Sequence, residues 1–422
     1  MNQYETNAMI QKFEEAGYEI VQEAKNADIS VVNTCTVTNM SDRKSRQMLR
    51  RCKEQNKDCI LIATGCYAQV GKEKLEEIPE IDLILGNNEK NDIVKYVEEY
   101  MQNKEEISLT TDLMYQKEFR EFGSTTYTEK TRAFIKIQDG CDRFCSYCII
   151  PYARGRVRSR ALENILEEVN KIVGAGIQEI VVTGIHIASY GKDLKQGIGL
   201  IDLLEKLNEI PGLKRIRIGS LEPLIITEEF VARLKKLEKV CPQFHLSLQS
   251  GCNETLKRMN RRYTTDDILK IANLLKENYT DVILTTDIIV GFPGETESEF
   301  NETYEFLKKI GLYKIHVFKY SKREGTKAAV MPNQVLEGTK DIRSKKIIEL
   351  SNENINKINQ KYIGQEVEVL IEEKENGYFN GHTKNYILVK SISDDENINN
   401  KMVKVLVESN FEEYLIGNVI NL

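Results

Sequence analysis

Residues 140–148 of the chain read GCDRFCSYC and place Cys141, Cys145 and Cys148 in the spacing C-x-x-x-C-x-x-C. Three thiolates in one tight loop can bind three irons of a 4Fe–4S cluster and leave the fourth iron open to another ligand. The alternative is a zinc site with its fourth ligand elsewhere, for example His186, because zinc normally takes four closed ligands. The loop directly follows an apolar strand pattern, where βα barrels carry their chemistry, and this position favours the cluster over zinc.

Strand and helix patterns alternate six times around and after this loop, between residues 132 and 320. The predicted strands lie at 133–138, 179–183, 215–218, 244–248, 283–290 and 314–320. Six βα units are too few for a closed eight-stranded barrel. We therefore predict a partly open parallel (βα)6 barrel with its site at the carboxyl ends of the strands.

The residues before the loop have the pattern of an open parallel α/β domain. Short apolar runs at 29–33, 59–64 and 81–85 alternate with helix patterns at 4–15, 41–55 and 72–77. Cys35 in NTC and Cys66 in TGC directly follow the first two runs. Because ligands collect at the carboxyl edge of such a sheet, these two cysteines are predicted to share a site.

The residues after the barrel switch to strand periodicity in EVEVLIEE, YILVK and MVKVLVE, which predicts a small β-barrel. Its 6 Lys stand against 11 Asp and Glu, so its net charge opposes RNA binding. The polar segment 102–130 is predicted to be a linker. The predicted division is an α/β domain at 1–101, the linker at 102–130, the barrel domain at 131–360 and the small β-barrel at 361–422.

The composition excludes several classes of protein. Of 422 residues, 41% are hydrophobic and 29% charged, as in ordinary globular proteins. No apolar run approaches the roughly 18 to 20 residues of a membrane span, and MNQYETNAMI lacks the pattern of a secretion signal. We therefore expect no membrane association. Nine cysteines, an odd number with three in one loop, favour a cytoplasmic thiol or metal function. The net charge of −6 means that any nucleic acid contact must come from local basic patches.

Two arginine groups are candidates for such patches. Arg154, Arg156, Arg158 and Arg160 alternate, and in an extended segment a period of two places all four on one face beside the cysteine loop. Guanidinium groups bind phosphates and carboxylates through paired donors, so these four are predicted to bind substrate, although salt bridges to neighbouring helices are the alternative. A second group, Arg258, Arg261 and Arg262 in RMNRR, would contact an RNA backbone or form a solvated helix end.

The cysteine loop, with Tyr147 before its last cysteine, resembles the radical S-adenosylmethionine (SAM) superfamily. CIIPYARGRVRSR, NTCTVTN, TGCYAQ, HLSLQSG, RMNRRYT and VGFPGET further resemble the methylthiotransferases, which insert a methylthio group into tRNA or a ribosomal protein. The resemblance covers essentially the whole chain. It implies an α/β domain, a radical SAM barrel and a terminal β-barrel of the TRAM type.

The resemblance also implies the cofactors and their ligands. Cys141, Cys145 and Cys148 would hold a 4Fe–4S cluster whose open iron binds SAM, and the reduced cluster would cleave SAM to a 5′-deoxyadenosyl radical. The expected SAM contacts follow successive barrel strands and are Thr183, Gly184, Ser220, Glu222, Gln249 and the GFPGE turn from Gly291. His186 is expected to line the pocket, and His245 to be a satisfied polar residue.

In this family a second, auxiliary 4Fe–4S cluster is held by three cysteines of the first domain. Two of them map onto Cys35 and Cys66, but the third should precede NQYE, and here the chain begins with Met1. The strand expected before it is absent too, so we expect the true start to lie upstream or the chain to be shortened; the alternative is a cluster with only two such ligands. Cys52, Cys59, Cys241 and Cys252 are expected to be buried packing residues.

NTCTVTNMSDRKSRQ and the alternating arginines resemble the enzymes that act on threonylcarbamoyladenosine beside the tRNA anticodon. The predicted function is methylthiolation of carbon 2 of that nucleoside, with one SAM methylating sulfur on the auxiliary cluster and a second SAM generating the radical. The implied partners are tRNA and an electron donor such as flavodoxin or ferredoxin. Isopentenyladenosine or a ribosomal protein aspartate are alternative substrates, and a non-catalytic zinc-bearing RNA-binding protein is the alternative of a different class.

Overall fold

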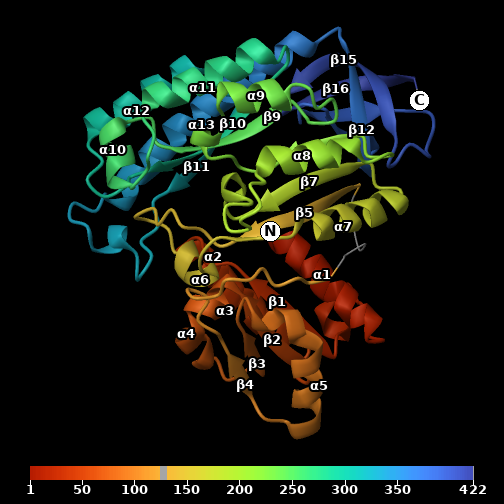
Figure 1. Cartoon of the computed structure of the whole chain (residues 1–422), viewed down its shortest axis with the longest axis vertical. Helices are drawn as coiled ribbons and strands as arrows, with labels where there is room; N and C mark the ends of the chain where they lie inside the picture. The colour runs from red at the N-terminus through yellow and green to blue at the C-terminus, as the bar shows by residue number, and fades with distance from the viewer. Residues whose placement is uncertain (124–130, 422) are drawn as a thin grey trace.

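The computed structural model describes residues 1–123 and 131–421, which form three parts. Figure 1 shows the N-terminal part in red and orange at the bottom, the central sheets and their helices in yellow to blue-green, and the C-terminal strands in blue at one side. This is the predicted order of an α/β domain, a partial βα barrel and a small β-barrel. Among the described residues, no helix is long and apolar enough to cross a bilayer.

The N-terminal part is a parallel sheet with helices on both faces. Its strands, in the order β1-β2-β3-β4, are β1 (Ile29–Thr34), β2 (Ile60–Gly65), β3 (Leu83–Leu85) and β4 (Ile107–Leu109). Its helices are α1 (Asn2–Glu15), α2 (Asn39–Gln55), α3 (Cys66–Val70), α4 (Lys72–Glu76) and α5 (Ile93–Asn103). Alternate residues of β2 face opposite sides, so Ile60 and Ile62 pack with α1 and α5, whereas Leu61 and Ala63 pack with α2, α3 and α4.

The prediction that residues 102–130 are a linker is wrong for part of that segment. Residues 107–109 form β4, which pairs with β3 in the parallel sheet. The three residues are too few to give a period of their own, and their pairing depends on the neighbouring strand rather than on local pattern. Residues 124–130 of the same segment lie outside the described residues.

The central part contains the six predicted parallel strands. They are β5 (Arg132–Asp139), β7 (Glu179–Gly184), β8 (Arg215–Ile218), β9 (Gln243–Gln249), β10 (Ile283–Val290) and β11 (Lys314–Lys319). They form two sheets, β6-β5-β7-β8 and β11-β10-β9. The short strand β6 (Arg158–Ser159) runs antiparallel to β5. Two isolated parallel bridges, Ile216 with Val240 and Leu221 with Leu246, connect the two sheets between β8 and β9. The strands therefore curve into the partly open barrel predicted from the sequence.

Helices cover the outside of this barrel. They are α7 (Leu162–Gly174), α8 (Leu200–Glu209), α9 (Glu228–Leu234), α11 (Thr265–Asn278), α12 (Glu297–Ile310) and α13 (Glu337–Asn359), with the shorter α6 (Ile150–Arg154) and α10 (Asn253–Arg258) at the strand ends. Their apolar faces and the strands form one core, in which Leu203, Phe244 and Leu275 are fully buried. Such alternation of strand and helix positions the loops after the strands at one end of the barrel.

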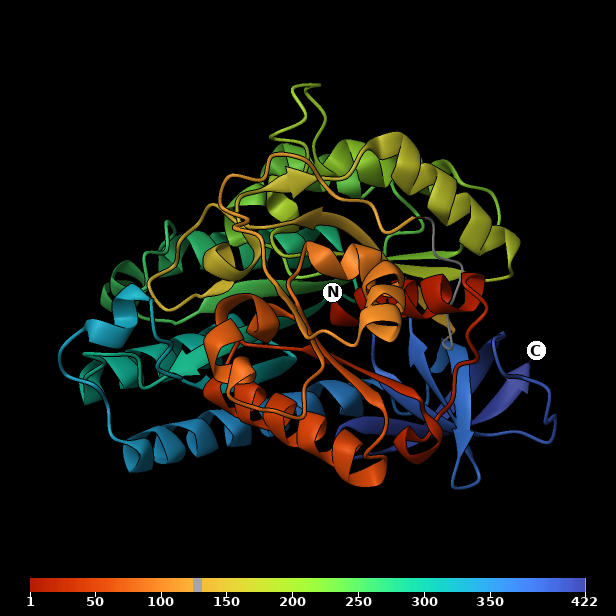
Figure 2. The ribbon, with the colours of Figure 1, turned by 90° about the horizontal axis from the view of Figure 1, so that it is seen from below.

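The C-terminal residues form a closed five-stranded barrel in the order β12-β13-β14-β16-β15. Its strands are β12 (Glu366–Glu375), β13 (Tyr378–Thr383), β14 (Leu388–Ile392), β15 (Met402–Phe411) and β16 (Tyr414–Asn421). Figure 2 shows α13 passing along the molecule toward these strands. Arg215 and Arg217 of β8 donate hydrogen bonds to the carbonyls of His382 and Thr383 at 3.0 Å, so the small barrel is fixed to the central part by buried guanidinium groups.

Candidate functional site

The three-cysteine loop leaves the carboxyl end of β5, and two glycines allow its close path. Gly140 has φ +71°, and a Cβ there would lie 1.8 Å from the carbonyl oxygen of Arg156. Gly155 has φ +72°, and its Cβ would lie 2.0 Å from the carbonyl oxygen of Leu113. The amide of Cys141 donates to the carbonyl of Gly155 at 3.0 Å. Because no side chain fits at either glycine, the loop can fold back on the segment after α6 only with glycine there.

The RMNRR segment supports the same loop from the other side. The amide of Ser146 donates to the carbonyl of Met259 at 3.1 Å, and Asn260 Nδ2 donates to the carbonyl of Phe144 at 3.0 Å. Phe144 has the unusual φ of +47°, so these contacts hold a strained residue between the first two cysteines.

The prediction for the RMNRR arginines needs correction. Arg258 forms a bidentate pair with Glu299, with both distances 2.8 Å. Arg261 is partly buried at the site, where its Nη1 donates to Cys145 Sγ at 3.3 Å and its Nη2 to the carbonyl of Ser247 at 2.8 Å. Only Arg262 of the three is exposed. Arg258 and Arg261 therefore contact other parts of the chain and do not form a solvated helix end or a surface for an RNA backbone. Their partners lie in distant segments, which the local spacing of the arginines cannot reveal.

Two of the loop sulfurs accept hydrogen bonds. Cys141 Sγ accepts from the amide of Arg143 at 3.4 Å, and Cys145 Sγ accepts from Arg261 Nη1 at 3.3 Å. Burial raises the pKa of Cys141 to about 11 and that of Cys148 to about 12. The Cys141 and Cys148 thiols are therefore protonated at neutral pH, and a bound metal would displace these protons. Donors to the sulfurs of Cys141 and Cys145 fit the ligands of an iron–sulfur cluster, whose potential such hydrogen bonds tune.

The zinc alternative finds no support in the geometry. Among residues 1–123 and 131–421, no group of three or more His, Cys, Asp or Glu side chains is placed to hold a single metal ion. His186, the suggested fourth ligand, instead shares a hydrogen bond with Ser189 at 2.8 Å and lies 3.3 Å from Glu222. A cluster spreads its ligands around several irons, so this test bears on a single zinc ion rather than on the cluster.

Cys35 and Cys66 leave neighbouring strands at the same level. Thr34 and Gly65 are paired in the parallel ladder of β1 and β2, and the two cysteines come next. Gly65 has φ +95°, and a Cβ there would lie 2.5 Å from the carbonyl oxygen of Thr34. The tight strand-to-helix turn therefore requires glycine and brings Cys66, at the start of α3, to the carboxyl edge beside Cys35.

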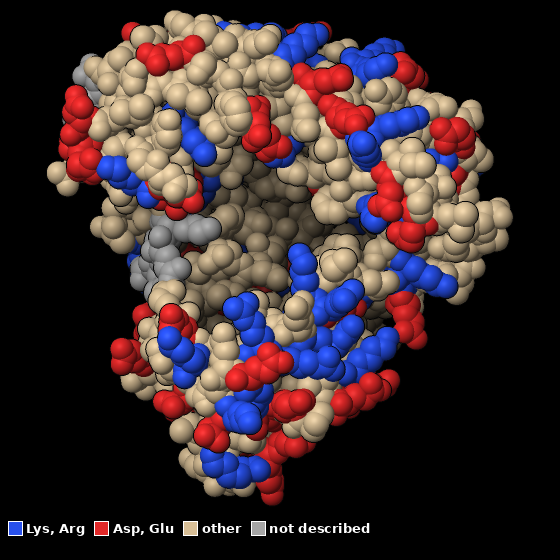
Figure 3. Space-filling model, turned by 180° about the vertical axis from the view of Figure 1, so that it is seen from behind, with Lys and Arg blue, Asp and Glu red and all other residues tan. Residues whose placement is uncertain are grey.

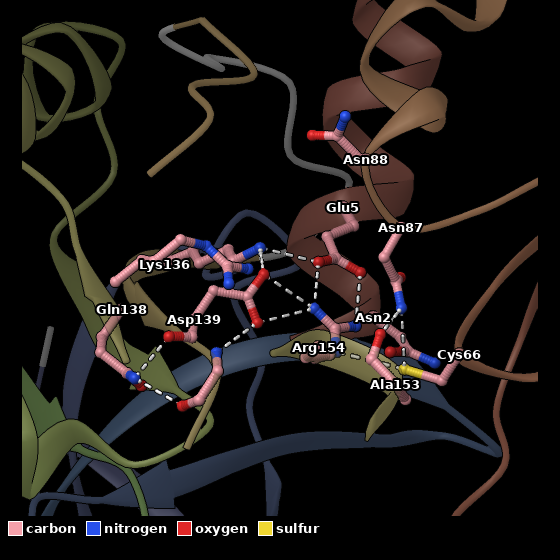
Figure 4. Close-up of polar contacts among 12 residues, drawn as sticks. Asn2, Glu5, Cys66, Asn87, Asn88, Lys136, Gln138, Asp139, Ala153 and Arg154 are labelled. Carbon is pink, nitrogen blue, oxygen red and sulfur yellow. Dashed lines mark hydrogen bonds and ion pairs between the residues drawn. The ribbon is translucent and has the colours of Figure 1, made fainter. Parts of the chain in front are cut away.

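Cys66 is also the point at which the N-terminal and central parts meet (Figure 4). Arg154, six residues after Cys148, donates from Nε to Cys66 Sγ at 3.2 Å. Asn87 Nδ2 lies 3.6 Å from the same sulfur and donates to the carbonyl of Ala153 at 2.8 Å. The helix that begins at Cys66 packs against α6. The loop of the first cysteine site thus leads directly into the surroundings of the second.

A buried charge network surrounds this junction. Glu5 of α1 accepts from Arg154 Nη1 at 2.6 Å, Lys90 Nζ at 2.6 Å and Lys136 Nζ at 2.8 Å. Asp139, at the end of β5, accepts from Lys136 at 2.6 Å and from Arg154 at 3.1 Å. Three cations thus face two carboxylates. Cysteine binds a metal as the thiolate, and the excess positive charge of this network would stabilise a metal-bound thiolate at Cys66.

The pKa values follow from burial and from these neighbours. Burial alone would raise the pKa of Glu5, but Arg154, Lys136 and Lys90 hold it well below its usual value. The same balance of burial against Arg154 and Lys136 lowers the pKa of Asp139. Burial lowers the pKa of Lys90 to about 8 against the opposing effect of Glu5. Both carboxyl groups are therefore ionised at neutral pH.

The predicted extended row of four arginines is wrong. Residues 150–154 form the helix α6, with Pro151 in its first turn, and Gly155 with its positive φ then reverses the chain. Arg154 points into the charge network, Arg158 is buried, and Arg160 is buried against Glu168 and against Glu121 at 2.7 Å. Of the four, Arg156 alone is exposed, and its guanidinium lies 4.7 Å from the ring centroid of Phe144. Salt bridges, the alternative stated above, describe Arg154 and Arg160.

The expected SAM contacts lie at the carboxyl ends of consecutive strands. Thr183 and Gly184 end β7, Ser220 and Glu222 follow β8, and Gln249 ends β9 with φ +72°. Glu222 is buried, and Arg143 of the cysteine loop donates to it. Tyr147 packs edge-on against Phe292 of the GFPGE turn at 6.5 Å between centroids. His245 contacts Thr285 at 3.0 Å and Asp287 at 3.2 Å.

Sequence reasoning missed several residues of the site, namely Glu5, Lys90, Lys136, Asp139 and the contact of Arg261 with Cys145. Two signals were available. Glu5 interrupts the buried face formed by Tyr4, Ala8 and Met9, and Lys136 stands inside the apolar run of β5. A charge at a core position indicates a buried partner of opposite sign, although not which residue supplies it.

Two family models match the chain. The radical SAM superfamily matches residues 135–307, and an uncharacterized protein family, UPF0004, matches residues 1–86. A Bacillus subtilis protein named threonylcarbamoyladenosine tRNA methylthiotransferase MtaB is 41% identical over 96% of this chain and 91% of its own length. The protein of the same name from Aquifex aeolicus is 40% identical over 96% of this chain and 97% of its own. A tRNA-2-methylthio-N(6)-dimethylallyladenosine synthase from Caldicellulosiruptor saccharolyticus is 35% identical over the whole chain and 90% of that protein.

Among solved structures, the radical SAM methyltransferase TsrM from Kitasatospora setae has a TM-score of 0.57 at 14% identity, covering 78% of this chain and 74% of that one. At this identity the likeness concerns the fold alone. It agrees with the arrangement of the α/β part and the partial barrel seen here.

Proposed function

Because the chain belongs to the tRNA methylthiotransferases of the radical SAM superfamily, we propose that it transfers a methylthio group to carbon 2 of N6-threonylcarbamoyladenosine beside the tRNA anticodon. The relatives named for this nucleoside reach 41% and 40% identity, against 35% for those named for dimethylallyladenosine. The latter nucleoside is therefore the second candidate.

One observation carries the chemical part of the proposal. Arg154 follows the first cysteine site along the chain and donates to Cys66 of the second, so a single short segment connects the two sites. A methylthio transfer needs both sites close together, because the atom that is activated must also receive the sulfur. The zinc-bearing RNA-binding alternative gives no reason for this connection.

The residues present fit a 4Fe–4S cluster at the loop and supply two cysteines for a second cluster. Cys141, Cys145 and Cys148 would hold the cluster that binds SAM, and Cys35 and Cys66 would supply two of the three cysteine ligands that the resemblance implies for the auxiliary cluster. When bound, these groups supply the radical that activates carbon 2 and the sulfur that is inserted. Thr183, Gly184, Ser220, Glu222 and Gln249 are proposed SAM contacts because they occupy consecutive strand ends.

The chain's own contribution is to hold these groups in fixed positions. Arg261 donates to Cys145, and Arg154 to Cys66, so each site has a guanidinium that balances thiolate charge. Arg143 joins the cysteine loop to Glu222 and thereby to the strand end after β8. Of the proposed substrate-binding arginines, Arg156 is retained because it is exposed next to Phe144.

The reaction also needs electrons. We assign their supply to a small redox protein such as flavodoxin or ferredoxin, because radical SAM chemistry begins with a reduced cluster. A tRNA substrate places the proposed activity in the cytoplasm.

The proposal is tested in a host that lacks tRNA methylthiolation and expresses this chain. Mass spectrometry of nucleosides from its bulk tRNA should detect methylthio-threonylcarbamoyladenosine. Methylthio-isopentenyladenosine in its place would transfer the assignment to the second candidate. Finding neither nucleoside would contradict the proposed activity.

A further inference from the structure

Helix α2 carries a local concentration of positive charge within a chain that is acidic as a whole. Between Asn39 and Gln55 it has six Lys and Arg against two Asp and Glu, whereas the whole chain has a net charge of −6. Its buried residues are Ser45, Leu49 and Cys52, which face the sheet. The cations therefore project from its other faces (Figure 3 shows Lys and Arg gathering on the lower, N-terminal part of the molecule beside a hollow).

Four of these cations have no protein partner. The side chains of Arg43, Lys44, Arg50 and Arg51 are exposed, and none of them makes an ion pair or hydrogen bond with the described residues. They stand at i and i+7 in two rows, about 10 Å apart along the helix. By contrast, Lys53 is paired with Asp82 at 3.1 Å. An unpaired basic face on an acidic protein indicates an anionic partner.

A groove runs along this helix toward the cysteine loop. Its first section, of about 510 Å³, is lined by Arg46, Arg50, Lys74 and Glu77 among others. Its second, of about 780 Å³, shares Tyr67 and Lys74 with the first and continues to Ile149, Tyr152 and Lys322. Two of its carboxylates are neutralised within the chain, Asp42 by Arg323 at 2.7 Å and Glu324 by Lys74 at 3.0 Å.

The inner end of the groove changes from basic to aromatic. Ile149 directly follows Cys148, and the Tyr152 side chain, 46% exposed, packs edge-on against Phe144 with 6.0 Å between centroids. The guanidinium of Arg156 stacks on the Phe144 ring, 4.7 Å from its centroid. Cations along the groove and the exposed Tyr152 ring at its inner end suit single-stranded RNA, because phosphates bind cations and unstacked bases stack on aromatic rings.

We infer that α2 and the groove beside it bind the phosphate backbone of the tRNA anticodon arm and direct its loop toward Tyr152 and the Cys148 end of the groove. This inference rests on the proposed function for the identity of the RNA. It assigns a part in substrate recognition to the N-terminal part of the chain. Backbone contacts of this kind position a nucleic acid without reading its sequence.

The test compares the affinity of the full chain for fluorescein-labelled bulk tRNA at several salt concentrations. The double variant Arg50→Gln/Arg51→Gln removes two exposed cations from α2 and keeps good helix formers. We expect its dissociation constant to rise by roughly five- to thirtyfold. The slope of log affinity against log salt should become less steep by about 1 for each arginine that contacts a phosphate.

Two further variants make the result specific. Lys235→Gln/Lys236→Gln removes two exposed charges at the end of α9, on the far side of the central part, and should bind like the wild type. Arg50→Lys/Arg51→Lys keeps both positive charges and should therefore retain most of the wild-type affinity for tRNA. Circular dichroism of each variant confirms that α2 still folds.

The outcomes are distinguishable. Equal losses in the α2 and α9 variants, or no loss in either, would overturn the assignment of this surface while leaving the proposed function intact. A wild-type chain that binds no tRNA would overturn both. A loss confined to Arg50→Gln/Arg51→Gln, with the reduced salt slope, supports the inference.

Discussion

At the residue scale, Arg154 and Arg261 each donate a hydrogen bond to the sulfur of a predicted cluster ligand. Arg261 donates to Cys145 at 3.3 Å and Arg154 to Cys66 at 3.2 Å, and both are held by further hydrogen bonds. A guanidinium stays charged at any physiological pH, so each arginine would stabilise the thiolate form that its cysteine needs as a metal ligand. The cysteines therefore depend on residues that lie far from them in the sequence.

The loop cysteines are tested by Cys145→Ala. Two remaining thiolates cannot present one open iron, so iron content after reconstitution should fall and SAM cleavage to 5′-deoxyadenosine should be lost. The matched control is Cys252→Ala, which removes a buried cysteine outside the loop. Retained deoxyadenosine formation in Cys145→Ala would exclude the loop as the SAM site.

The role of Arg154 is tested against its neighbour in the same segment. Arg154→Gln leaves Glu5 and Asp139 with less compensation, so we expect a loss of about 3 to 5 kcal/mol in the free energy of unfolding. Arg156→Gln, whose side chain is 52% exposed, should cost less than about 1 kcal/mol. Urea unfolding measures both. Equal stability of the two variants would contradict this structural role and favour the original prediction that Arg154 contacts the substrate.

These residues show what the sequence could reveal. The spacing of Cys141, Cys145 and Cys148 carries its own chemistry and was sufficient to find the first site. The ion-pair partner of Arg154 cannot be predicted from the sequence, because Glu5 lies 149 positions away along the chain. Alternation suggested an extended segment, but Pro151 and Gly155 define a helical turn there.

At the element scale, α1 is attached to the central part by charge and to the N-terminal sheet by its apolar face. Glu5 is fully buried and contacts Lys136 of β5, while Tyr4, Ala8 and Met9 pack against the N-terminal sheet. The helix therefore contacts both parts, and its one buried carboxylate, Glu5, joins them.

This attachment predicts a pH dependence. The pKa of Glu5 is lowered in the folded state, so its contribution to stability is present above its unfolded value of 4.5 and is lost as pH falls through the folded value. Glu5→Gln should be less stable than the wild type by about 3 to 5 kcal/mol at pH 7. Urea unfolding at decreasing pH should show this difference shrinking below about pH 5.

The control for this variant lies on the same helix. Glu14 is exposed, so Glu14→Gln should change the free energy of unfolding by less than about 0.5 kcal/mol at every pH. A difference between Glu5→Gln and the wild type that does not vary with pH would show that the buried carboxylate is not the source of the effect.

The turn between β2 and α3 gives a further prediction. Gly65→Ala combines a positive φ with a Cβ 2.5 Å from the Thr34 carbonyl, so the turn must shift and move Cys66 relative to Cys35. Gly17→Ala shares the positive φ of +88° but has no atom within 4 Å of the Cβ. Gly65→Ala should therefore retain less iron after reconstitution than Gly17→Ala. Equal iron content would argue against a ligand role for Cys66.

Elements with a clear period were predictable, and short ones were not. The predicted strands at 29–33, 179–183 and 283–290 form within one or two residues of their observed ends, because each is an apolar run that packs on both faces. β4 has three residues and exists only through its pairing with β3. Local pattern cannot show such a strand.

At the scale of the whole molecule, the N-terminal part closes over the strand ends of the barrel. The contact of α3 with α6 and the pairs of Glu5 with Lys136 and Arg154 join the two parts at the cysteine sites. The C-terminal barrel is attached elsewhere, on β8 through Arg215 and Arg217. The order of the three parts could be predicted from the change between helix and strand periodicity along the chain. How the parts pack against one another could not, because their contacts depend on charged residues that are far apart in the sequence.

The central claim is that these sites together transfer a methylthio group to threonylcarbamoyladenosine in tRNA. The most direct measurement incubates the anaerobically reconstituted chain with a reductant, SAM deuterated in its methyl group, and tRNA that carries threonylcarbamoyladenosine, followed by mass spectrometry of the nucleosides. We predict a methylthio-threonylcarbamoyladenosine that contains the full deuterium label. Threonylcarbamoyladenosine that remains unchanged while the same preparation cleaves SAM to 5′-deoxyadenosine would contradict the claim.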